Sequence, residues 1–426
     1  MRRAICRVAL VLVFIALSLT SSNAQKLSAE EQKIIDYVDA HMGEAIGMVE
    51  NVVNIESPSE DIAGVKQVGS IFKRELESLG LTARWIEMPV EMKRAGHLVA
   101  STKGTKGQRV LLLGHIDTVL RGEKFKREGN KAFGTGSSDM KAGDVVLLYA
   151  LKALHATGAL KDTRITVMLT GDEESAGHPI EISRRDMVSA AKDSDLALSF
   201  EGTVGNTATV GRRGSSNWTL EVQARTGHSA SIFGESMGSG AIFEAARVIN
   251  QFYETLHNEK YLTFNPSLVV GGTEATLDGP SGIATGKTNV VAGKAIVRGD
   301  LRFISEAQKD AARAKMREIV ARALPRAASR ITFEDGYPAM TPSEGNNALL
   351  KEMNQASQDL GFGKIEALDP GARGAGDIAF VSHLIPGLDG IGASGGGAHA
   401  PGEFVDLETL PKVTKKAAVL IYRLTR

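Results

Sequence analysis

Short apolar runs that alternate with helical patterns constrain the fold of this chain more than any other feature. Residues 165–170 and 196–200 are almost continuously apolar, and further strands are expected at 81–88, 97–101 and 109–113. Apolar runs between helices are typical of strands that are buried on both faces of a sheet. We therefore expect an α/β fold with a mixed, largely parallel sheet.

A different pattern begins near Gly211. Apolar and polar side chains alternate at 218–224, helical patterns follow, and the resulting order is strand, helix, strand, strand, helix, strand. The helices are expected at 240–256 and 305–324, and the later strands at 268–271, 290–303 and 331–334. This order is the split βαβ or ferredoxin-like arrangement. We predict one α/β domain, residues 25–210 and 337–426, interrupted by a smaller ferredoxin-like α+β domain at 211–336.

The first 24 residues have the pattern of a secretory signal peptide. Three arginines precede an apolar run at 8–19, and small residues around Ala24 offer a cleavage site. A run of this length is too short to span a bilayer but is typical of a signal sequence. We expect an exported protein, periplasmic or secreted, with no membrane attachment after cleavage; an uncleaved anchor is the alternative.

The cysteine content and the net charge exclude several kinds of metal site and binding partner. The only cysteine, Cys6, lies within the predicted signal peptide, so the mature protein would lack disulfides and thiolate ligands. The 50 basic and 50 acidic side chains balance, which argues against binding to nucleic acid. Any metal ion must therefore be held by histidines and carboxylates.

Polar side chains directly follow three of the apolar runs. They are His115 and Asp117, Glu173 and Glu174, and Glu201. In open α/β sheets, ligands bind beyond the carboxyl ends of the strands, so we expect these groups to converge on one crevice.

Two further groups complete a candidate metal site. Asp139 opens a helix after a glycine turn, and His399 lies in a loop with several nearby glycines. Two histidines and several carboxylates, without cysteine, suit a two-metal hydrolytic centre, most naturally of zinc.

The sequence spacing of these residues indicates which of them bind metal and which have other roles. His115 and Asp117 lie on one face if the strand continues, so Asp117 can accept the second ring N–H of His115. Glu173 and Glu174 are adjacent and cannot easily do the same task. One of the two can bind metal while the other acts as the general base.

The segments that carry these residues resemble the di-zinc metallopeptidase family of glutamate carboxypeptidase, aminoacylase, acetylornithine deacetylase and succinyl-diaminopimelate desuccinylase. In kind, the chain is most similar to the bacterial glutamate carboxypeptidases. The matching segments are Gly-His-Ile-Asp-Thr-Val at 114–119, Gly-Ser-Ser-Asp-Met-Lys-Ala-Gly at 136–143, Asp-Glu-Glu at 172–174, Ser-Phe-Glu-Gly at 199–202 and Gly-Ala-His-Ala-Pro-Gly at 397–402. They follow the family's order and span nearly the whole chain beyond the signal peptide.

The resemblance implies a role for each residue. One zinc ion would be held by His115 and Glu201, the other by Glu174 and His399, with Asp139 bridging the two; Co²⁺ is an alternative metal. Glu173 would activate the bridging water, and Asp117 would orient His115. A glutamate at position 201 implies a carboxypeptidase, aminoacylase or deacylase rather than an aminopeptidase or dipeptidase.

The resemblance also implies that the inserted domain is a lid that forms a homodimer. His228, in Gly-His-Ser-Ala, matches a histidine that reaches across the dimer to the scissile carbonyl, and Asn289 matches a substrate-contacting position. Where relatives carry an arginine for the substrate carboxylate, this chain has Gly-Tyr-Pro at 336–338, so we predict that Arg373 takes that task through a bidentate pair. The expected substrate is a small peptide or an N-acyl amino acid.

Three rival interpretations fit less well. A Gly-x-Ser-x-Gly match at Ser236, followed by Asp377 and His399, has the order of a serine hydrolase, but the segment before it is too polar for a buried strand. Gly-Lys-Thr at 286–288 lacks the earlier glycine of a phosphate loop. An exported binding protein would not need the full ligand set. N-acyl-amino-acid deacetylases and dipeptidases of the same family remain alternatives.

Overall fold

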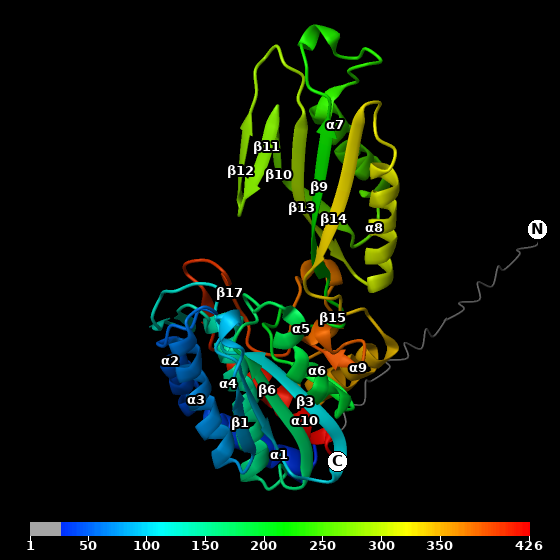
Figure 1. The fold of residues 1–426 in the computed structure, drawn as a ribbon. Coiled ribbons are helices and arrows are strands. Elements are labelled where there is room, and N and C mark those ends of the chain that lie inside the picture. The colour runs from blue at the N-terminus through cyan, green and yellow to red at the C-terminus, as the bar shows by residue number, and fades with distance from the viewer. Residues whose placement is uncertain (1–26) are drawn as a thin grey trace, which may run out of the picture.

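The structure is a computed structural model that describes residues 27–426, and it has two bodies joined at a narrow junction (Figure 1). The main body surrounds a six-stranded sheet, and the inserted body, residues 214–335, is built on a four-stranded sheet. An antiparallel bridge between Arg212 and Met340 pairs the two segments that cross between the bodies. The predicted signal peptide, with Cys6, lies outside the described residues.

The sheet of the main body has the order β1-β2-β6-β3-β7-β16. Its strands are β1 (Thr82–Ile86), β2 (His97–Ser101), β3 (Lys106–His115), β6 (Thr163–Thr170), β7 (Leu196–Ser199) and β16 (Gly387–Leu388). β2 runs antiparallel to both neighbours, whereas β6, β3, β7 and β16 are mutually parallel. The expected mixed, largely parallel sheet is therefore confirmed.

Both faces of this sheet are covered, which explains the continuous apolar runs. Val110 and Leu112 of β3 pack into a core with the helices of one face, whereas Leu111 and Leu113 pack on the other face with Met187 of α6. The helices of the main body are α1 (Ala29–Ala40), α2 (Met42–Val53), α3 (Ile62–Ser78), α4 (Ala142–Ala156), α5 (Ile180–Ser183), α6 (Arg185–Lys192), α9 (Glu344–Asp359) and α10 (Leu410–Leu424). α4 is buried along most of its length, so it forms the centre of one layer.

The inserted body has the predicted strand–helix order. It comprises β9 (Gly214–Ala224), α7 (Gly240–Leu256), β10 (Thr263–Gly272), β13 (Lys294–Phe303), α8 (Glu306–Val320) and β14 (Ala327–Asp335). The sheet order is β10-β13-β9-β14, and every pair is antiparallel. The inward side chains of its strands pack with α7 and α8 in a separate core, which includes Trp218, Phe252 and Met316.

Several short elements were not predicted. A hairpin of β11 (Glu274–Asp278) and β12 (Ser281–Thr285) precedes β13, which therefore begins at Lys294 rather than at residue 290. The Asp-Gly pair at 278–279 is a turn signal that could have identified it. A small sheet of β17 (Gly395–Gly396), β18 (Phe404–Asp406), β5 (Lys131–Phe133) and β4 (Lys126–Glu128) flanks the loop of His399, and β8 (Thr207–Ala208) pairs with β15 (Glu366–Ala367). Strands of two or three residues carry too little periodicity to be recognised.

Within residues 27–426, no helix combines the length and the apolar character needed to cross a bilayer.

Close backbone packing beside the sheet yields a stability prediction. A Cβ atom on Gly143, in the first turn of α4, would lie 2.1 Å from the carbonyl oxygen of Phe200, whereas one on Gly47 of α2 would meet nothing within 4 Å. Gly143→Ala should therefore destabilise the protein by about 1–3 kcal/mol through backbone displacement. Gly47→Ala should stabilise it by up to about 1 kcal/mol. Urea denaturation tests this, and equal midpoints for the two variants would refute the packing argument.

Candidate metal centre

Three strand ends place polar groups at one edge of the main sheet. β3 ends at His115, the loop after β6 carries Glu173 and Glu174, and Glu201 lies just beyond β7. The three strands are parallel neighbours in the order β6-β3-β7, so their carboxyl ends meet at the same edge. The expected convergence of these residues therefore occurs.

The five predicted metal ligands form two clusters that share one residue. His115, Asp139 and Glu201 form the first, and Asp139, Glu174 and His399 form the second; within each, the ligand atoms lie within 4.8 Å of one another. Asp139 Oδ1 lies 3.3 Å from His115 Nε2, and Asp139 Oδ2 lies 3.1 Å from His399 Nε2. Each carboxylate oxygen of Asp139 thus faces a different cluster.

The Asp117 carboxylate contacts several of the segments that meet at this edge. Its side chain is fully buried, accepts hydrogen bonds from Ser59 Oγ at 2.6 Å and from the backbone N–H groups of Glu173 and Glu174, and lies 3.4 Å from His115 Nδ1. His115 Nδ1 also lies 3.1 Å from the Asp117 carbonyl oxygen. With Nδ1 directed at Asp117, His115 Nε2 faces the cluster.

The donor set fits a divalent cation. The buried Nε2 atom of His115 has no hydrogen-bond partner among the described residues, although carboxylate oxygens surround it. Hydrogen bonds to Asp139 and Glu174 raise the pKa of His399 to about 10, and burial raises the pKa of Glu174 to about 7. Protons and a divalent cation would therefore compete for these ligand atoms.

Glu403 supports the backbone that carries Asp139, and the sequence analysis missed it. Its carboxylate accepts hydrogen bonds at 2.8–2.9 Å from the backbone N–H groups of Gly136, Ser138 and Asp139. Glu403 follows the glycine-rich loop of His399, so an acidic residue at the end of that motif was the available signal.

Glu173 lies beside both clusters without belonging to either. It forms a third grouping with His115 and Glu174, and burial raises the pKa of its carboxyl well above the usual range. The neighbouring carboxylates of Glu201 and Asp377 raise that pKa further. A carboxylate with a raised pKa at this position is suited to accept a proton.

A cavity of about 410 Å³ opens in front of these groups and is lined by both bodies. Its lining residues are Asp139, Glu173, Glu174, Glu201, Arg212, Arg302, Tyr337, Gly374, Ala375 and His399. Arg302 comes from β13 of the inserted body and lies 2.9 Å from Asp300. Sequence reasoning missed Arg302, because an arginine on an alternating strand gives no sign of which cavity the strand borders.

The predicted Arg373 borders a different cavity of the same centre. It lines a smaller cavity of about 170 Å³ with Asp139 and Glu201, and its Nη2 donates to the Gly202 carbonyl oxygen at 3.1 Å. Arg212, also missed from the sequence, is buried between Asp389 at 2.7 Å and Glu201 at 3.7 Å.

His228 and Asn289 lie together but far from the metal clusters of the same chain. A bridge pairs His228 with Val290, and Ser229 N–H donates to the Asn289 carbonyl oxygen at 2.9 Å. Both residues lie beyond the ends of β9 and β13 that point away from the main body (Figure 1). Ser236 lies in an exposed turn before α7, with no strand directly before it, so it does not form a nucleophile elbow.

The chain is similar to known proteins in sequence and in fold. The model of peptidase family M20/M25/M40 matches residues 111–423. Carboxypeptidase G2 from Pseudomonas sp. strain RS-16 is 28% identical over 395 residues, which are 88% of each chain. Aminopeptidase PepT from Bacillus cereus superposes with a TM-score of 0.72 at 16% identity, covering 90% of this chain and 99% of that chain. The YXEP protein of Bacillus subtilis, a dinuclear metal-binding peptidase, has a TM-score of 0.61 at 16% identity and covers 91% and 99%.

The raised pKa of His399 predicts that ion binding depends on pH. A divalent ion must displace the proton of His399, whose pKa is about 10, so affinity should rise with pH. We expect about a tenfold rise in apparent Zn²⁺ affinity per pH unit between pH 6 and 8 for each proton released. Competition with a chelator of known affinity measures this. An affinity that is independent of pH would contradict the assigned ligands.

Proposed function

The chain belongs to peptidase family M20/M25/M40, and on this premise we propose that it is an exported, zinc-dependent enzyme of the carboxypeptidase kind. It is a hydrolase of amide bonds, of the metallopeptidase and amidohydrolase class. Its proposed substrates are small peptides or N-acyl amino acids with a free carboxylate next to the scissile bond. The similarity to carboxypeptidase G2 and the glutamate at position 201 support this choice.

One observation carries the proposal: two three-ligand clusters share Asp139, and the free carboxylate of Glu173 stands beside them. Histidine and carboxylate ligands suit Zn²⁺ or Co²⁺. Two divalent ions at such a centre supply Lewis-acid polarisation of a carbonyl and a lowered pKa for water. We assign His115 and Glu201 to one ion, Glu174 and His399 to the other, and Asp139 to both.

Glu173 performs the proton transfers in this proposal. Its carboxylate takes a proton from the attacking water and later delivers it to the nitrogen of the leaving amine, because one group can act as base and then as acid. Asp117 fixes the tautomer of His115 and holds the Glu173 and Glu174 backbone by their N–H groups.

Arg302 replaces Arg373 as the first choice for the substrate carboxylate. Arg302 lines the same cavity as Glu173 and His399. Its Nε atom donates to Asp300, but its side chain is 37% exposed, so its guanidinium is accessible to a ligand. Arg373 is 14% exposed and already donates to Gly202. A bidentate pair from a cavity-lining arginine would fix the carboxylate next to the scissile bond.

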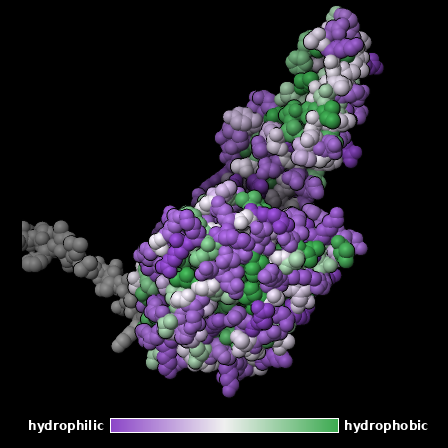
Figure 2. Space-filling view, turned by 90° about the vertical axis from the view of Figure 1, so that its left-hand side faces the viewer, coloured by the Kyte–Doolittle hydropathy of each residue, from purple (hydrophilic) through white to green (hydrophobic). Residues whose placement is uncertain are grey.

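His228 and Asn289 would act on the active site of the partner subunit. Within one chain they lie at the far end of the inserted body, so a contribution to catalysis requires a second copy. Six of the eleven large apolar side chains that are exposed among the described residues lie in this body: Phe233, Ile242, Phe243, Tyr253, Val269 and Ile283. Apolar residues also show on its surface in Figure 2. This surface supports a homodimer formed through the inserted body.

The first test concerns the general base. Glu173→Gln should retain both ions but lose turnover by about 100- to 10,000-fold, because the amide cannot accept a proton. Metal analysis and steady-state kinetics on N-acyl glutamates, other N-acyl amino acids and dipeptides measure both properties and also separate the carboxypeptidase, deacetylase and dipeptidase alternatives. Glu181→Gln, an exposed glutamate outside the centre, is the matched control.

Near-native turnover of Glu173→Gln would exclude Glu173 as the base. Ser236→Ala should leave turnover unchanged, and a folded but inactive Ser236→Ala protein would favour the serine-hydrolase alternative instead.

A second test distinguishes the two arginines. Arg302→Ala should raise KM about 10- to 150-fold for substrates with a free carboxylate, since a charge-assisted hydrogen bond is lost. The effect should shrink for the amide-capped form of the same substrate. If Arg373→Ala instead gives the larger rise in KM, Arg373 binds the carboxylate.

A third test uses mixed dimers. His228→Ala should lower turnover by about 100-fold or more, because a donor to the developing oxyanion is lost. Mixing His228→Ala chains with Glu173→Gln chains creates one site with an intact Glu173 centre and an intact His228 from the other chain. Recovered activity is expected. Subunit exchange without recovery would mean that His228 does not act across subunits.

A further inference from the structure

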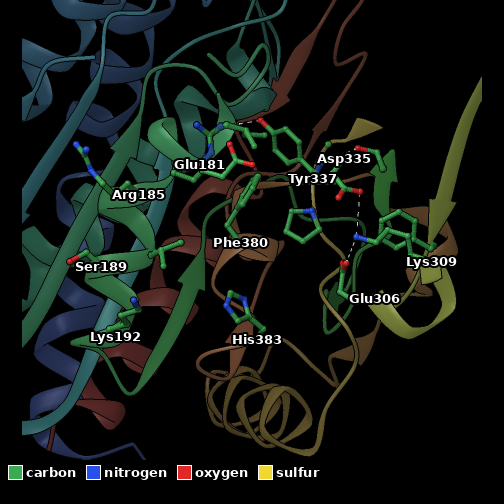
Figure 3. A pocket seen from close by; sticks show the side chains of 17 residues that line it. Glu181, Arg185, Ser189, Lys192, Glu306, Lys309, Asp335, Tyr337, Phe380 and His383 are labelled. Atoms are coloured by element: carbon green, nitrogen blue, oxygen red, sulfur yellow. Dashed lines mark hydrogen bonds and ion pairs between the residues drawn. The ribbon is translucent and has the colours of Figure 1, made fainter. Parts of the chain in front are cut away.

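Tyr337 lies at the junction of the two bodies, two residues after β14 ends at Asp335. Its side chain borders the catalytic cavity on one side and a second cavity of about 730 Å³ on the other. The second cavity, the junction cavity, is lined by α5 and α6 of the main body and by the start of α8 in the inserted body (Figure 3). Tyr337 therefore separates the catalytic groups from a space whose walls belong to different bodies.

The hydroxyl of Tyr337 makes two hydrogen bonds of opposite direction. It donates to the backbone carbonyl oxygen of Glu173 at 2.5 Å and accepts from Arg184 Nη2 at 2.9 Å. Burial raises the pKa of Tyr337 far above its usual range, so the hydroxyl keeps the proton that it donates. Glu173 is thus held on both sides of its backbone, by Asp117 at the N–H group and by Tyr337 at the carbonyl group.

Arg184 anchors Tyr337 to the main body. Its guanidinium is 1% exposed and lies 2.5 Å from Asp172 and 2.7 Å from Asp377. Asp377 also accepts from Thr170 at the end of β6. A guanidinium that is buried and paired on several sides has little freedom to move, so it fixes the main-body side of the contact.

We propose that Tyr337 is a positioning residue that couples the orientation of the inserted body to the backbone of Glu173. The backbone of Tyr337 moves with the segment that returns from β14, whereas its hydroxyl is bonded to the loop of Glu173. Rotation of the inserted body therefore displaces the general base relative to the metal ligands. The inference rests on the proposed role of Glu173.

The first measurement is kinetic. Tyr337→Phe keeps the ring but removes the hydroxyl, so kcat should fall about 5- to 30-fold while KM and bound zinc stay unchanged. Tyr149→Phe, which removes the hydroxyl of a buried tyrosine in α4, is the matched control and should keep native kcat. A rise in KM at unchanged kcat would mean that Tyr337 contacts substrate instead, which overturns the proposal.

The second measurement displaces the inserted body directly. In a Cys6→Ser background, Ser189→Cys places the only thiol of the chain on the exposed α6 wall of the junction cavity. Maleimides of increasing size, from N-methyl to N-pyrenyl, are then attached to this thiol to push the inserted body away from α6. When Tyr337 is unchanged, turnover of the Ser189→Cys protein should fall as the size of the attached maleimide increases. The same protein without a maleimide should have native turnover.

The same adducts in the Tyr337→Phe background should cause little additional loss, because the contact that transmits the displacement is already absent. Equal losses in both backgrounds, or no loss across the whole series, would overturn the coupling. Native kcat in Tyr337→Phe, with Glu173→Gln inactive, would also overturn it but leave the proposed function intact. Activity in Glu173→Gln would refute the proposed function itself.

Discussion

The concentration of negative charge at one buried edge of the main sheet is the constraint on which the rest of this structure depends. Asp117, Asp139, Glu173, Glu174 and Glu201 lie close together and largely out of water, where unpaired carboxylates are costly. Neighbouring groups offset this cost in different ways. Backbone N–H groups bond to Asp117, Arg212 lies beside Glu201, and Asp139 is left facing two histidines, where divalent ions would complete the neutralisation.

The sequence predicts most of this arrangement because its signals are local. A buried parallel strand has a recognisable apolar run, and its first polar residue marks the strand end, so His115 and Glu201 could be placed without a structure. Asp139 and His399 could be placed because each lies in a short motif. The inserted body was predicted for the same reason, since its strands alternate with period two.

The residues that were missed act across long distances in the chain. Glu403 binds the backbone of Asp139 from the far end of the sequence, and Arg302 reaches the centre from another body. In the sequence, Tyr337 stands out only because it lies where relatives carry an arginine, and its contact with Glu173 depends on how the two bodies meet. Periodicity reports which face of an element is buried, but it does not report which distant segment covers that face.

The packing around the Phe200 backbone makes one side of the metal centre more rigid than the other. Gly143 and Gly392, from separate segments, both approach the Phe200 carbonyl so closely that a methyl group on either would overlap it. Glu201, the next residue, therefore rests on main chain that tolerates almost no adjustment, whereas the Glu173 carbonyl group is held by the side chain of Tyr337 at the junction of the two bodies. Changes in the inserted body would therefore reach Glu173 through Tyr337, but they would leave Glu201 in place beside His115 and Asp139.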